Sequence, residues 1–418
     1  MTIMKKTSCF VCLMVFLAFM SACKGRSGKA VEEKSEEIEF HEIDLSKDFT
    51  GSTCDNLLLS DIVEDVEYVQ LETTENGLVE CYPRTKYAIT PNDIFTLNRF
   101  SKKELFRFDR TTGKFISPIG QIGQGPEDMM NPSGIYAEKN NVYVVSSDHI
   151  YIYDKDGEHL STIPILSSGS TVSAINDERL IYHPRQRPHI SEGVFGKWTS
   201  VNVIDFEGNV LSAKVDTLEG ITGGIYSLDF NPQRWYYSGQ LNFYNEPDET
   251  VYAVTEEGVI PRYHFNLGGN EWPVRAGSMK KEDVECISFK AFKETGDYLY
   301  IYWNQNQKAY FARFDKNSGK LEVQEQEPFS GSLWQLFAFG PKNDIDGCGS
   351  YFGPIDISED KSGSILFEIN PDNIDRVREA LEKAENVKFP EKRQQLLKML
   401  DERKEDDNPI LVIYKLKK

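Results

Sequence analysis

The stretch IYIYDKDGEHLSTIPI, residues Ile150 to Ile165, decides the fold of this chain. Its first half alternates with the period of a β-strand, so that Tyr151 and Tyr153 share one face. Asp154 then favours a turn by bonding its own backbone, and Gly157 accepts a positive φ without steric cost. Because a second alternating run follows the glycine, the stretch predicts a β-hairpin.

The same hairpin recurs along the chain. Each copy has an alternating strand, a turn residue such as Asp, a Gly three to four residues later and a second alternating strand. The other copies are ELFRFDRTTGKFISPI (104–119), SVNVIDFEGNVLSAKV (200–215), TVYAVTEEGVIPRYHF (250–265) and AYFARFDKNSGKLEVQ (309–324). One or two further strands precede each hairpin. A recurring unit of about 50 residues and four strands is typical of a propeller blade.

Six blades account for the chain best. Five full copies lie between about Tyr82 and Gln326, and a sixth begins near Trp334 and ends in the strand NPILVIYKLK (408–417). The strand VEYVQLET (66–73) has no hairpin partner, and pairing it with the last blade would hide both edges. Five or seven blades are the alternative counts, whereas a jelly roll or stacked sandwiches would not explain the regular hairpins. The sequence therefore predicts an all-β, six-bladed β-propeller over residues 40–418.

One segment, about residues 371–406, breaks this pattern and is predicted to be helical. Asp372 is placed to cap the first helix, and Pro390 splits the stretch in two. Apolar residues recur at helical spacing in both halves, namely Ile374, Val377, Leu381, Leu396, Leu397 and Leu400. The insertion precedes the last strand of the final blade. It is interpreted as a helical hairpin that packs its apolar stripe on the ring, with a partner-docking arm as the alternative.

The glycine-rich stretch IGQGPEDMMNPSGIY (122–136) looks at first like a nucleotide-binding loop. A dinucleotide fingerprint needs a third Gly where Asp128 stands, and the helix that should follow is interrupted by Pro132. A phosphate-binding P-loop would need Gly-Lys-Ser/Thr, which is absent. The stretch is instead predicted to connect the outermost strand of one blade to the innermost strand of the next. There it would hold two blades together and could line a ligand site.

The N-terminus has the features of an export signal. Residues 1–22 contain Lys5 and Lys6, an apolar run of about a dozen residues and then Ser21-Ala22, which together indicate a signal peptide. Cys23 follows directly, as in bacterial lipoproteins, so we expect it to be lipidated and to anchor the protein in a membrane. Ordinary secretion with a chance cysteine is the alternative. Residues 23–39 are polar, lack apolar periodicity and are expected to form a flexible tether.

Charge and cysteine content exclude some functions. The formal charge of −19 becomes −21 once residues 1–22, with two lysines and no acids, are removed. So acidic a chain argues against nucleic acid as a partner, because nucleic-acid binding depends on Lys and Arg neutralising phosphates. The cysteines beyond Cys23 are Cys54, Cys81, Cys286 and Cys348. No pair has CxxC spacing, and the sequence leaves disulfides and buried free thiols equally open.

Several of these features together resemble a known family. Gly123-Gln124-Gly125-Pro126-Glu127 follows one strand and precedes another that ends in Tyr153-Asp154-Lys155-Asp156-Gly157. With DIVEDVEYVQLET near the start and DDNPILVIYKLK at the end, this pattern resembles the six-bladed β-propeller lipoproteins of Bacteroidetes, which are similar to NHL-type propellers. The family usually has Gly before the Glu and Tyr after it, where this chain has Pro126 and Asp128. The resemblance spans residues 40–418 and implies fold and export, since most members have no assigned activity.

Catalytic motifs are missing from the sequence. His183 and His189 are six residues apart and could bind a metal, but no third ligand is visible nearby, and a solvated loop is the simpler interpretation. His149 and His159 flank a hairpin whose alternation places them apart. There is no Gly-x-Ser-x-Gly elbow, HExxH helix or EF-hand spacing. We therefore predict no catalytic residue, no metal site and no cofactor, and neither calcium nor a transition metal has support.

Aromatic residues are a further candidate for ligand binding. Trp235-Tyr236-Tyr237 and Trp272 could stack on sugar rings, although packing between blades also needs bulky aromatic side chains.

These observations favour a binding or scaffolding propeller over an enzyme. We expect a lipoprotein of the cell envelope, anchored in the outer membrane of a Gram-negative bacterium. Its partners would be a glycan, a peptide or an envelope protein. The candidate ligand site is the channel mouth near Gln124, Glu127 and Asp128. The alternative is a metal-dependent lyase or hydrolase, as some NHL-like propellers are.

Overall fold

The computed structural model describes most of the chain. The described residues are 38–47, 49, 54, 57–81, 84–100, 102–125, 127–167, 169–184, 196–218, 233–245, 248–256, 258–270, 285–306, 308–326, 338–351, 357–358 and 364–418. The predicted signal peptide, Cys23 and all but the last two residues of the predicted tether lie outside them. Within these ranges no helix is long and apolar enough to span a membrane.

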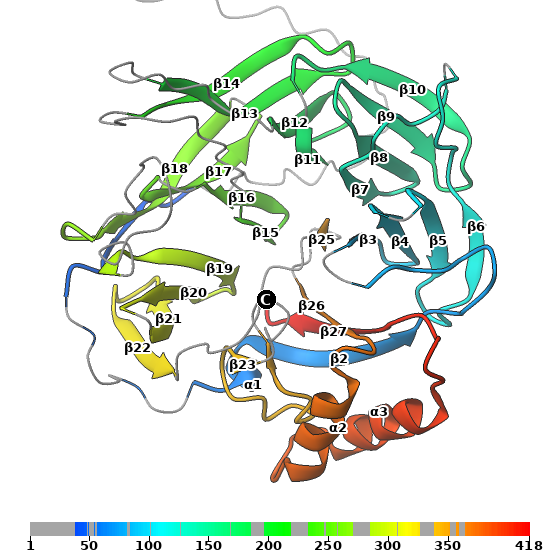
Figure 1. The fold of residues 1–418 in the computed structure, drawn as a ribbon. Coiled ribbons are helices and arrows are strands. Elements are labelled where there is room, and N and C mark those ends of the chain that lie inside the picture. Colours follow the sequence, from blue (N-terminus) through cyan, green and yellow to red (C-terminus); the bar gives the residue numbers. More distant parts are fainter. Residues whose placement is uncertain are drawn as a thin grey trace, which may run out of the picture. The chain divides into compact units, whose positions relative to one another are not determined.

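Six blades stand around a common centre (Figure 1). In blades 1 to 5, four consecutive strands pair antiparallel from the innermost to the outermost. Blade 1 contains β3 (Thr85–Ile89), β4 (Asp93–Asn98), β5 (Leu105–Asp109) and β6 (Phe115–Pro118). Blade 2 contains β7 (Gly134–Glu138), β8 (Asn141–Val145), β9 (His149–Asp154) and β10 (His159–Pro164). The predicted six-bladed propeller is confirmed.

The next three blades follow the same plan. Blade 3 contains β11 (Gly169–Ala174), β12 (Arg179–Pro184), β13 (Gly196–Asp205) and β14 (Val210–Leu218). Blade 4 contains β15 (Gln233–Tyr237), β16 (Gln240–Tyr244), β17 (Thr250–Thr255) and β18 (Gly258–Asn266). Blade 5 contains β19 (Ser288–Glu294), β20 (Tyr298–Gln305), β21 (Lys308–Asp315) and β22 (Leu321–Gln326). In all five complete blades the predicted hairpin supplies the two outermost strands.

Blade 6 joins the two ends of the described chain. It contains β26 (Ser364–Ile369), β27 (Ile410–Leu416) and β2 (Val63–Gln70), with β27 in the middle. Tyr68 of β2 lies opposite Val412, which also lies opposite Phe367 of β26. The predicted pairing of an N-terminal strand with the last blade is therefore correct.

Three short strands precede β26 along the chain. β23 (Ala338–Phe339) and β24 (Ser350–Tyr351) pair in parallel with each other. β25 (Ile357–Ser358) pairs in parallel with β3, at the edge of blade 1 that faces the centre (Figure 1). The inner edge of blade 1 is therefore covered by a strand from the other end of the chain.

A strap at the N-terminal end of the propeller was not predicted, and its described residues are 41–47, 49, 54 and 57–62. Its first strand, β1 (His41–Asp44), pairs in parallel with β18, the outermost strand of blade 4. The Cys54 amide then donates to the Val323 carbonyl of blade 5 at 3.2 Å, and α1 (Leu59–Ile62) leads into β2 of blade 6. Ile43 and Leu45 are buried in the core that blades 4 and 5 share. The strap thus connects the outer edges of three blades.

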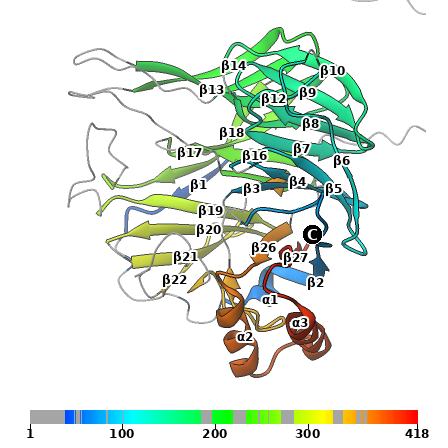
Figure 2. The same cartoon turned by 45° about the vertical axis from the view of Figure 1, so that its right-hand side comes forward.

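The helical insertion folds back on blade 6. Helices α2 (Ile374–Lys383) and α3 (Pro390–Glu402) lie side by side outside β2 (Figures 1 and 2). Apolar side chains of both helices are buried in the same core as β2 and β27, namely Val377, Leu381, Leu396 and Leu400. The packing interpretation is therefore confirmed. The predicted cap, Asp372, is wrong, because Asn373 occupies the N-cap position and its side chain bonds to Asn370 and Glu368.

Two hairpin turns have a glycine with the same backbone angle but with different surroundings, so they separate the effect of backbone strain from the effect of a side-chain clash. Gly113 and Gly319 both have φ +70°, but a Cβ on Gly113 would lie 1.9 Å from the Gln70 carbonyl oxygen, whereas open space surrounds Gly319. We expect Gly319→Ala to cost about 1–2 kcal/mol of stability from the backbone alone. Gly113→Ala should cost about 1–3 kcal/mol more, because blade 6 must move away. Urea unfolding of both variants measures the difference, and equal losses would contradict the contact.

Candidate functional site

Polar side chains from three innermost strands meet on the central side of blades 2, 3 and 4. We call these residues the channel cluster: Tyr136 and Glu138 of β7, Ser173 of β11, and Arg234 and Tyr236 of β15. β7, β11 and β15 are the strands of their blades nearest the centre (Figure 1). Tyr136, Ser173 and Tyr236 are buried, whereas Glu138 and Arg234 are half-buried and reach solvent. The cluster therefore combines enclosed hydroxyl groups with two accessible charges.

The alternation of two strands explains why these side chains converge. In β7 the segment GIYAE places Tyr136 and Glu138 on one face. In β15 the segment QRWYY places Arg234 and Tyr236 on one face and Trp235 on the other. The Arg234 face turns toward blade 3, because Arg234 Nη1 lies 3.3 Å from Ser173 Oγ and 3.5 Å from the Val172 carbonyl oxygen. Two neighbouring blades thus present polar faces to the strand between them.

Among the described residues, one hydroxyl of this cluster has no hydrogen-bond partner of good geometry. The Tyr136 hydroxyl donates to Glu138 Oε2 at 2.8 Å. The Tyr236 hydroxyl lies near Ser173 and Tyr136, yet no group within the described ranges meets it in good hydrogen-bond geometry. Buried polar atoms almost always have a partner, so such a hydroxyl calls for an explanation. A ligand or a water molecule beside this hydroxyl would satisfy it.

Electrostatics keep both phenols of the channel cluster protonated. Burial raises the pKa of Tyr136, and the neighbouring Tyr236 and Glu138 raise it further. Burial also raises the pKa of Tyr236, although Ser173, Tyr136 and Arg234 act in the opposite direction. Both hydroxyls are therefore neutral donors at any physiological pH. Together with the Glu138 carboxylate and the Arg234 guanidinium, they offer donors and acceptors to a polar ligand.

The opposite face of β15 belongs to a buried charge network between blades 4 and 5. Its centre is Glu294, at the end of β19, whose side chain is fully buried. Glu294 accepts hydrogen bonds from Arg262 at 2.6 and 2.9 Å, Tyr263 at 2.8 Å, Trp235 at 3.1 Å and Lys316 at 3.1 Å. Two cations and two neutral donors thus surround one carboxylate, and this network joins the two blades.

The same network decides the role of the aromatic segment Trp235-Tyr236-Tyr237. Trp235 is buried, stacks on Phe292 at 5.1 Å and donates to Glu294, so it packs in the core and does not present a face to a sugar. Tyr237 lies beneath Lys316, whose Nζ is 4.1 Å from the ring centre. Core packing is therefore the correct interpretation for the rings of Trp235 and Tyr236, which belong to two buried cores. Trp272 lies outside the described residues.

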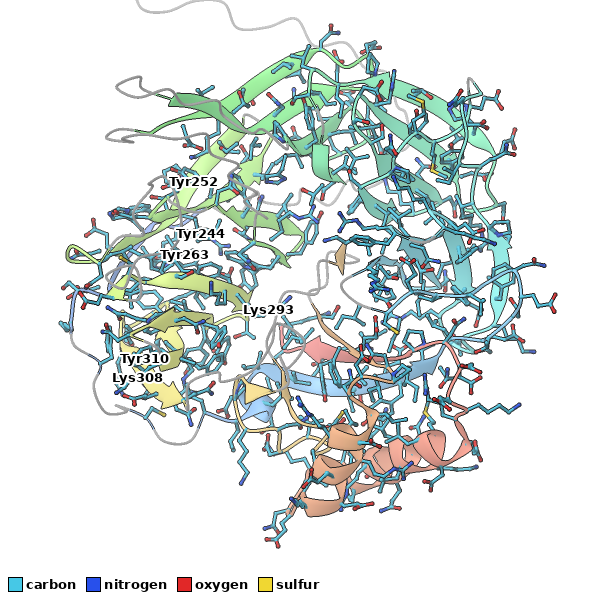
Figure 3. All side chains as sticks on the ribbon, viewed as in Figure 1. Tyr244, Tyr252, Tyr263, Lys293, Lys308 and Tyr310 are labelled. Carbon is cyan, nitrogen blue, oxygen red and sulfur yellow. The ribbon has the colours of Figure 1, made fainter. Side chains whose placement is uncertain are left out.

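A lysine from the neighbouring blade also reaches the centre. Lys293, next to Glu294 in β19, lies on the central side of blade 5 (Figure 3). Its Nζ donates to the Ser364 carbonyl oxygen of β26 at 2.9 Å, and the side chain is buried. Lys293 therefore joins blades 5 and 6.

The predicted ligand loop lies between blades 1 and 2. Gln124 and Glu127 are exposed, whereas Asp128 is half-buried and accepts a hydrogen bond from the Gly125 amide at 2.7 Å. The Tyr153 hydroxyl donates to the Glu127 carbonyl oxygen at 2.8 Å, and Met129 is buried in the core shared by the two blades. The loop therefore holds two blades together, as predicted. Pro126 lies outside the described residues.

The histidines of the described chain have local partners. His183 is buried, with Nδ1 2.9 Å from Thr171 Oγ1, and His189 lies outside the described residues. His149 Nδ1 lies 3.0 Å from Asp148, and His159 Nε2 lies 2.8 Å from Thr162 Oγ1. In the described part of the chain, no group of three or more His, Cys, Asp or Glu side chains is placed to hold a metal ion.

The sequence left open whether the cysteines form disulfides or are free thiols. Cys54, Cys81, Cys286 and Cys348 are all free thiols. Burial raises the pKa of Cys81 to about 12. It also raises the pKa of Cys348 well above its usual value, because this thiol is enclosed in the core that includes the two helices. The predicted lipidation site, Cys23, lies outside the described residues.

The channel cluster itself was not predicted. Its signal was present, because Glu138 and Arg234 are charged residues in strands that lie innermost in their blades. Neighbouring blades surround the innermost strands, and a charge is costly to bury there unless it has partners. Charged residues in these strands therefore indicate a polar cluster.

Comparisons with known proteins agree with this fold. A family model described as "Domain of unknown function (DUF4934)" matches residues 40–415. A candidate exported protein from Bacteroides fragilis has a similar crystal structure, at 18% identity and TM-score 0.57, over 90% of this chain and 99% of that chain. A member of the DUF4221 family from Bacteroides vulgatus matches at 9% identity and TM-score 0.38, over 64% of this chain and 86% of that chain. No curated protein matches the chain.

Proposed function

The chain belongs to the DUF4934 family, and on this premise we propose that it is an exported, lipid-anchored propeller that binds a glycan or peptide ligand in its channel. Three features support export to the cell envelope: the signal-like residues 1–22, the cysteine at position 23 and the likeness to a candidate exported protein of Bacteroides fragilis. The outer membrane of a Gram-negative bacterium is the proposed location. The binding role rests on the channel cluster.

The observation that carries the binding role is the buried Tyr236 hydroxyl beside two half-buried charges. A hydroxyl-rich ligand could accept from Tyr236 and Arg234 and donate to Glu138, so that the Tyr236 hydroxyl would gain the partner that it lacks among the described residues. Sugars and peptide backbones both offer donors and acceptors of this kind. Binding sites in propellers and other folds must be argued from such groups, because the fold alone does not assign a function.

The loop between blades 1 and 2 is proposed as a second contact. Gln124 and Glu127 are exposed polar residues and are free to meet a ligand that extends beyond the channel. Asp128 is the weaker member of the three predicted residues, because its carboxylate already accepts from the Gly125 amide.

The test uses residues 24–418 of the chain and follows thermal unfolding with panels of oligosaccharides and peptides. We expect one class of ligand to raise the melting temperature of the wild type. Glu138→Gln should then weaken calorimetric affinity at least tenfold, because a hydrogen bond to a charged group contributes about 1.5–3 kcal/mol.

The matched control is Glu207→Gln, which makes the same chemical change in an exposed hairpin turn of blade 3. This variant should bind as the wild type does. The channel assignment fails if Glu138→Gln keeps full affinity, and the binding role fails if neither panel shifts the melting temperature.

A further inference from the structure

The first residue of the strap makes an aromatic contact with blade 4. The His41 ring stacks on the Tyr263 ring, with centroids 5.3 Å apart and planes 14° apart. It also meets the edge of Phe314 of blade 5 at 5.7 Å. This stacking holds the four-residue β1 on β18 together with the burial of Ile43 and Leu45. Tyr263 is labelled in Figure 3 among the side chains of blade 4.

Four charged side chains surround His41, namely Glu39, Arg262, Glu294 and Lys316. Tyr263 donates to Glu294, the centre of the buried network, which Arg262 of β18 and Lys316 after β21 also contact. Glu39, on the segment that precedes β1, lies 3.7 Å from His41 Nε2. The Glu39 carboxylate is 76% exposed, so water screens its attraction. Glu294 is already neutralised by two cations.

A positive charge on His41 would therefore be the third cation around one buried carboxylate. Arg262 already lies over the Tyr263 ring, with its guanidinium carbon 5.1 Å from the ring centre, so a charged imidazole would compete for the same aromatic ring. The neutral imidazole stacks on Tyr263 without this repulsion. The docked position of β1 thus favours neutral His41.

We infer that β1 is an acid-sensitive latch, in which protonation of His41 releases the strand from the outer edge of blade 4. The latch is the segment His41–Asp44 together with its contacts to β18. Its release would not open the ring, because closure depends on the separate pairing of β2 with β27. The inference does not depend on the ligand proposed for the channel.

The direction of the pH effect follows from the linkage between protonation and docking. Burial lowers the pKa of His41 from its usual 6.5, and Arg262 and Lys316 act in the same direction, whereas Glu39 and Glu294 oppose them. Well above pH 6.5 the imidazole is neutral in both states, and docking has its full stability. As the pH falls below 6.5 the released strand takes up a proton first, so docking weakens until the docked imidazole also titrates.

Release of the latch would uncover a strand edge. β18 is the outermost strand of blade 4, and β1 is its partner in parallel pairing. An uncovered edge presents unpaired amide and carbonyl groups that can accept a strand from another chain. Acidification would therefore turn a covered edge of blade 4 into a pairing surface.

Hydrogen–deuterium exchange of residues 24–418 tests the latch at pH 7.5 and pH 5.0, with exchange times corrected for the intrinsic rate. We expect the protection of residues 41–45 to fall about three- to thirtyfold in the wild type, the upper limit being set by an undocked pKa of 6.5 at pH 5.0. Protection of residues 410–416 should not change. His41→Phe keeps an aromatic ring on Tyr263 but cannot titrate, so its latch should be equally protected at both pH values.

His41→Gln serves as a second non-titrating variant if the phenylalanine does not pack. The inference is overturned if the wild type shows no loss of protection between the two pH values. It is also overturned if both variants lose protection as the wild type does, or if residues 410–416 lose protection together with the latch, which would indicate general acid unfolding.

Discussion

Val412→Asp should unfold the propeller, or reduce its free energy of unfolding by roughly 4 kcal/mol or more. Val412 is fully buried in the central strand of blade 6, between Tyr68 of β2 and Phe367 of β26. A carboxylate there would have no cation and would lose its hydration. The same strand joins the two ends of the described chain, so its loss should open the ring. Circular dichroism during urea unfolding and limited proteolysis measure both effects.

Lys415→Ala in the same strand is the matched control. Lys415 is exposed, and its replacement should change stability by less than about 0.5 kcal/mol. A Val412→Asp protein that unfolds cooperatively with wild-type stability would show that blade 6 does not close the ring in solution.

Glu294→Ala should have the second largest effect, a loss of about 3–5 kcal/mol. The substitution leaves Arg262 and Lys316, both of which are largely enclosed between blades 4 and 5, without their shared carboxylate. It also removes the acceptor of Tyr263 and Trp235. Breaking one partner of a buried ion network is costly because the remaining charges stay enclosed without compensation. Thermal and urea unfolding of the variant measure the loss.

Glu379→Ala is the control for this prediction. Glu379 pairs with Lys383 on the exposed surface of α2, where water screens the ion pair, so its loss should change stability far less than the loss of Glu294. The two variants remove the same side chain from a buried network and from a solvated pair. Similar losses in both would contradict a structural role for the network.

The blades could be predicted from the sequence because their turns are decided locally. In the hairpin of blade 2, Asp154 Oδ1 accepts hydrogen bonds from the amides of Asp156 and Glu158 at 2.9 and 2.8 Å. Asp205 makes the same two contacts in blade 3. Each turn is therefore encoded within five residues, and repetition of the pattern along the chain reveals the blades.

The strap could not be predicted in the same way. The segment HEIDL contains only two apolar residues in alternation, and the strand that pairs with it lies in blade 4. Its burial depends on the edge of β18 and on the core shared by blades 4 and 5, which local sequence does not show. The N-cap of α2 could not be assigned from the sequence either, because Asp372 and Asn373 are both good capping residues. Contacts of Asn373 with Asn370 and Glu368 decide between them.

The channel cluster depends on the arrangement of whole blades. Tyr136 and Tyr236 come from blades 2 and 4, and they approach each other only because both lie on strands next to the centre. The sequence places each residue in its strand but does not give the distance between strands of two blades that have a third blade between them. The exposed loop residues Gln124 and Glu127 were easier to propose, because a glycine-rich connection is visible in the sequence itself.

Closure of the ring by β2 and β27 has a consequence for the order of folding during synthesis. Tyr68 and its partner Val412 are separated by almost the whole length of the propeller in the chain. At about 5–20 residues per second, β2 must wait roughly 20–70 seconds for β27. During that interval no complete ring can form, so the blade that begins first is the blade that is completed last.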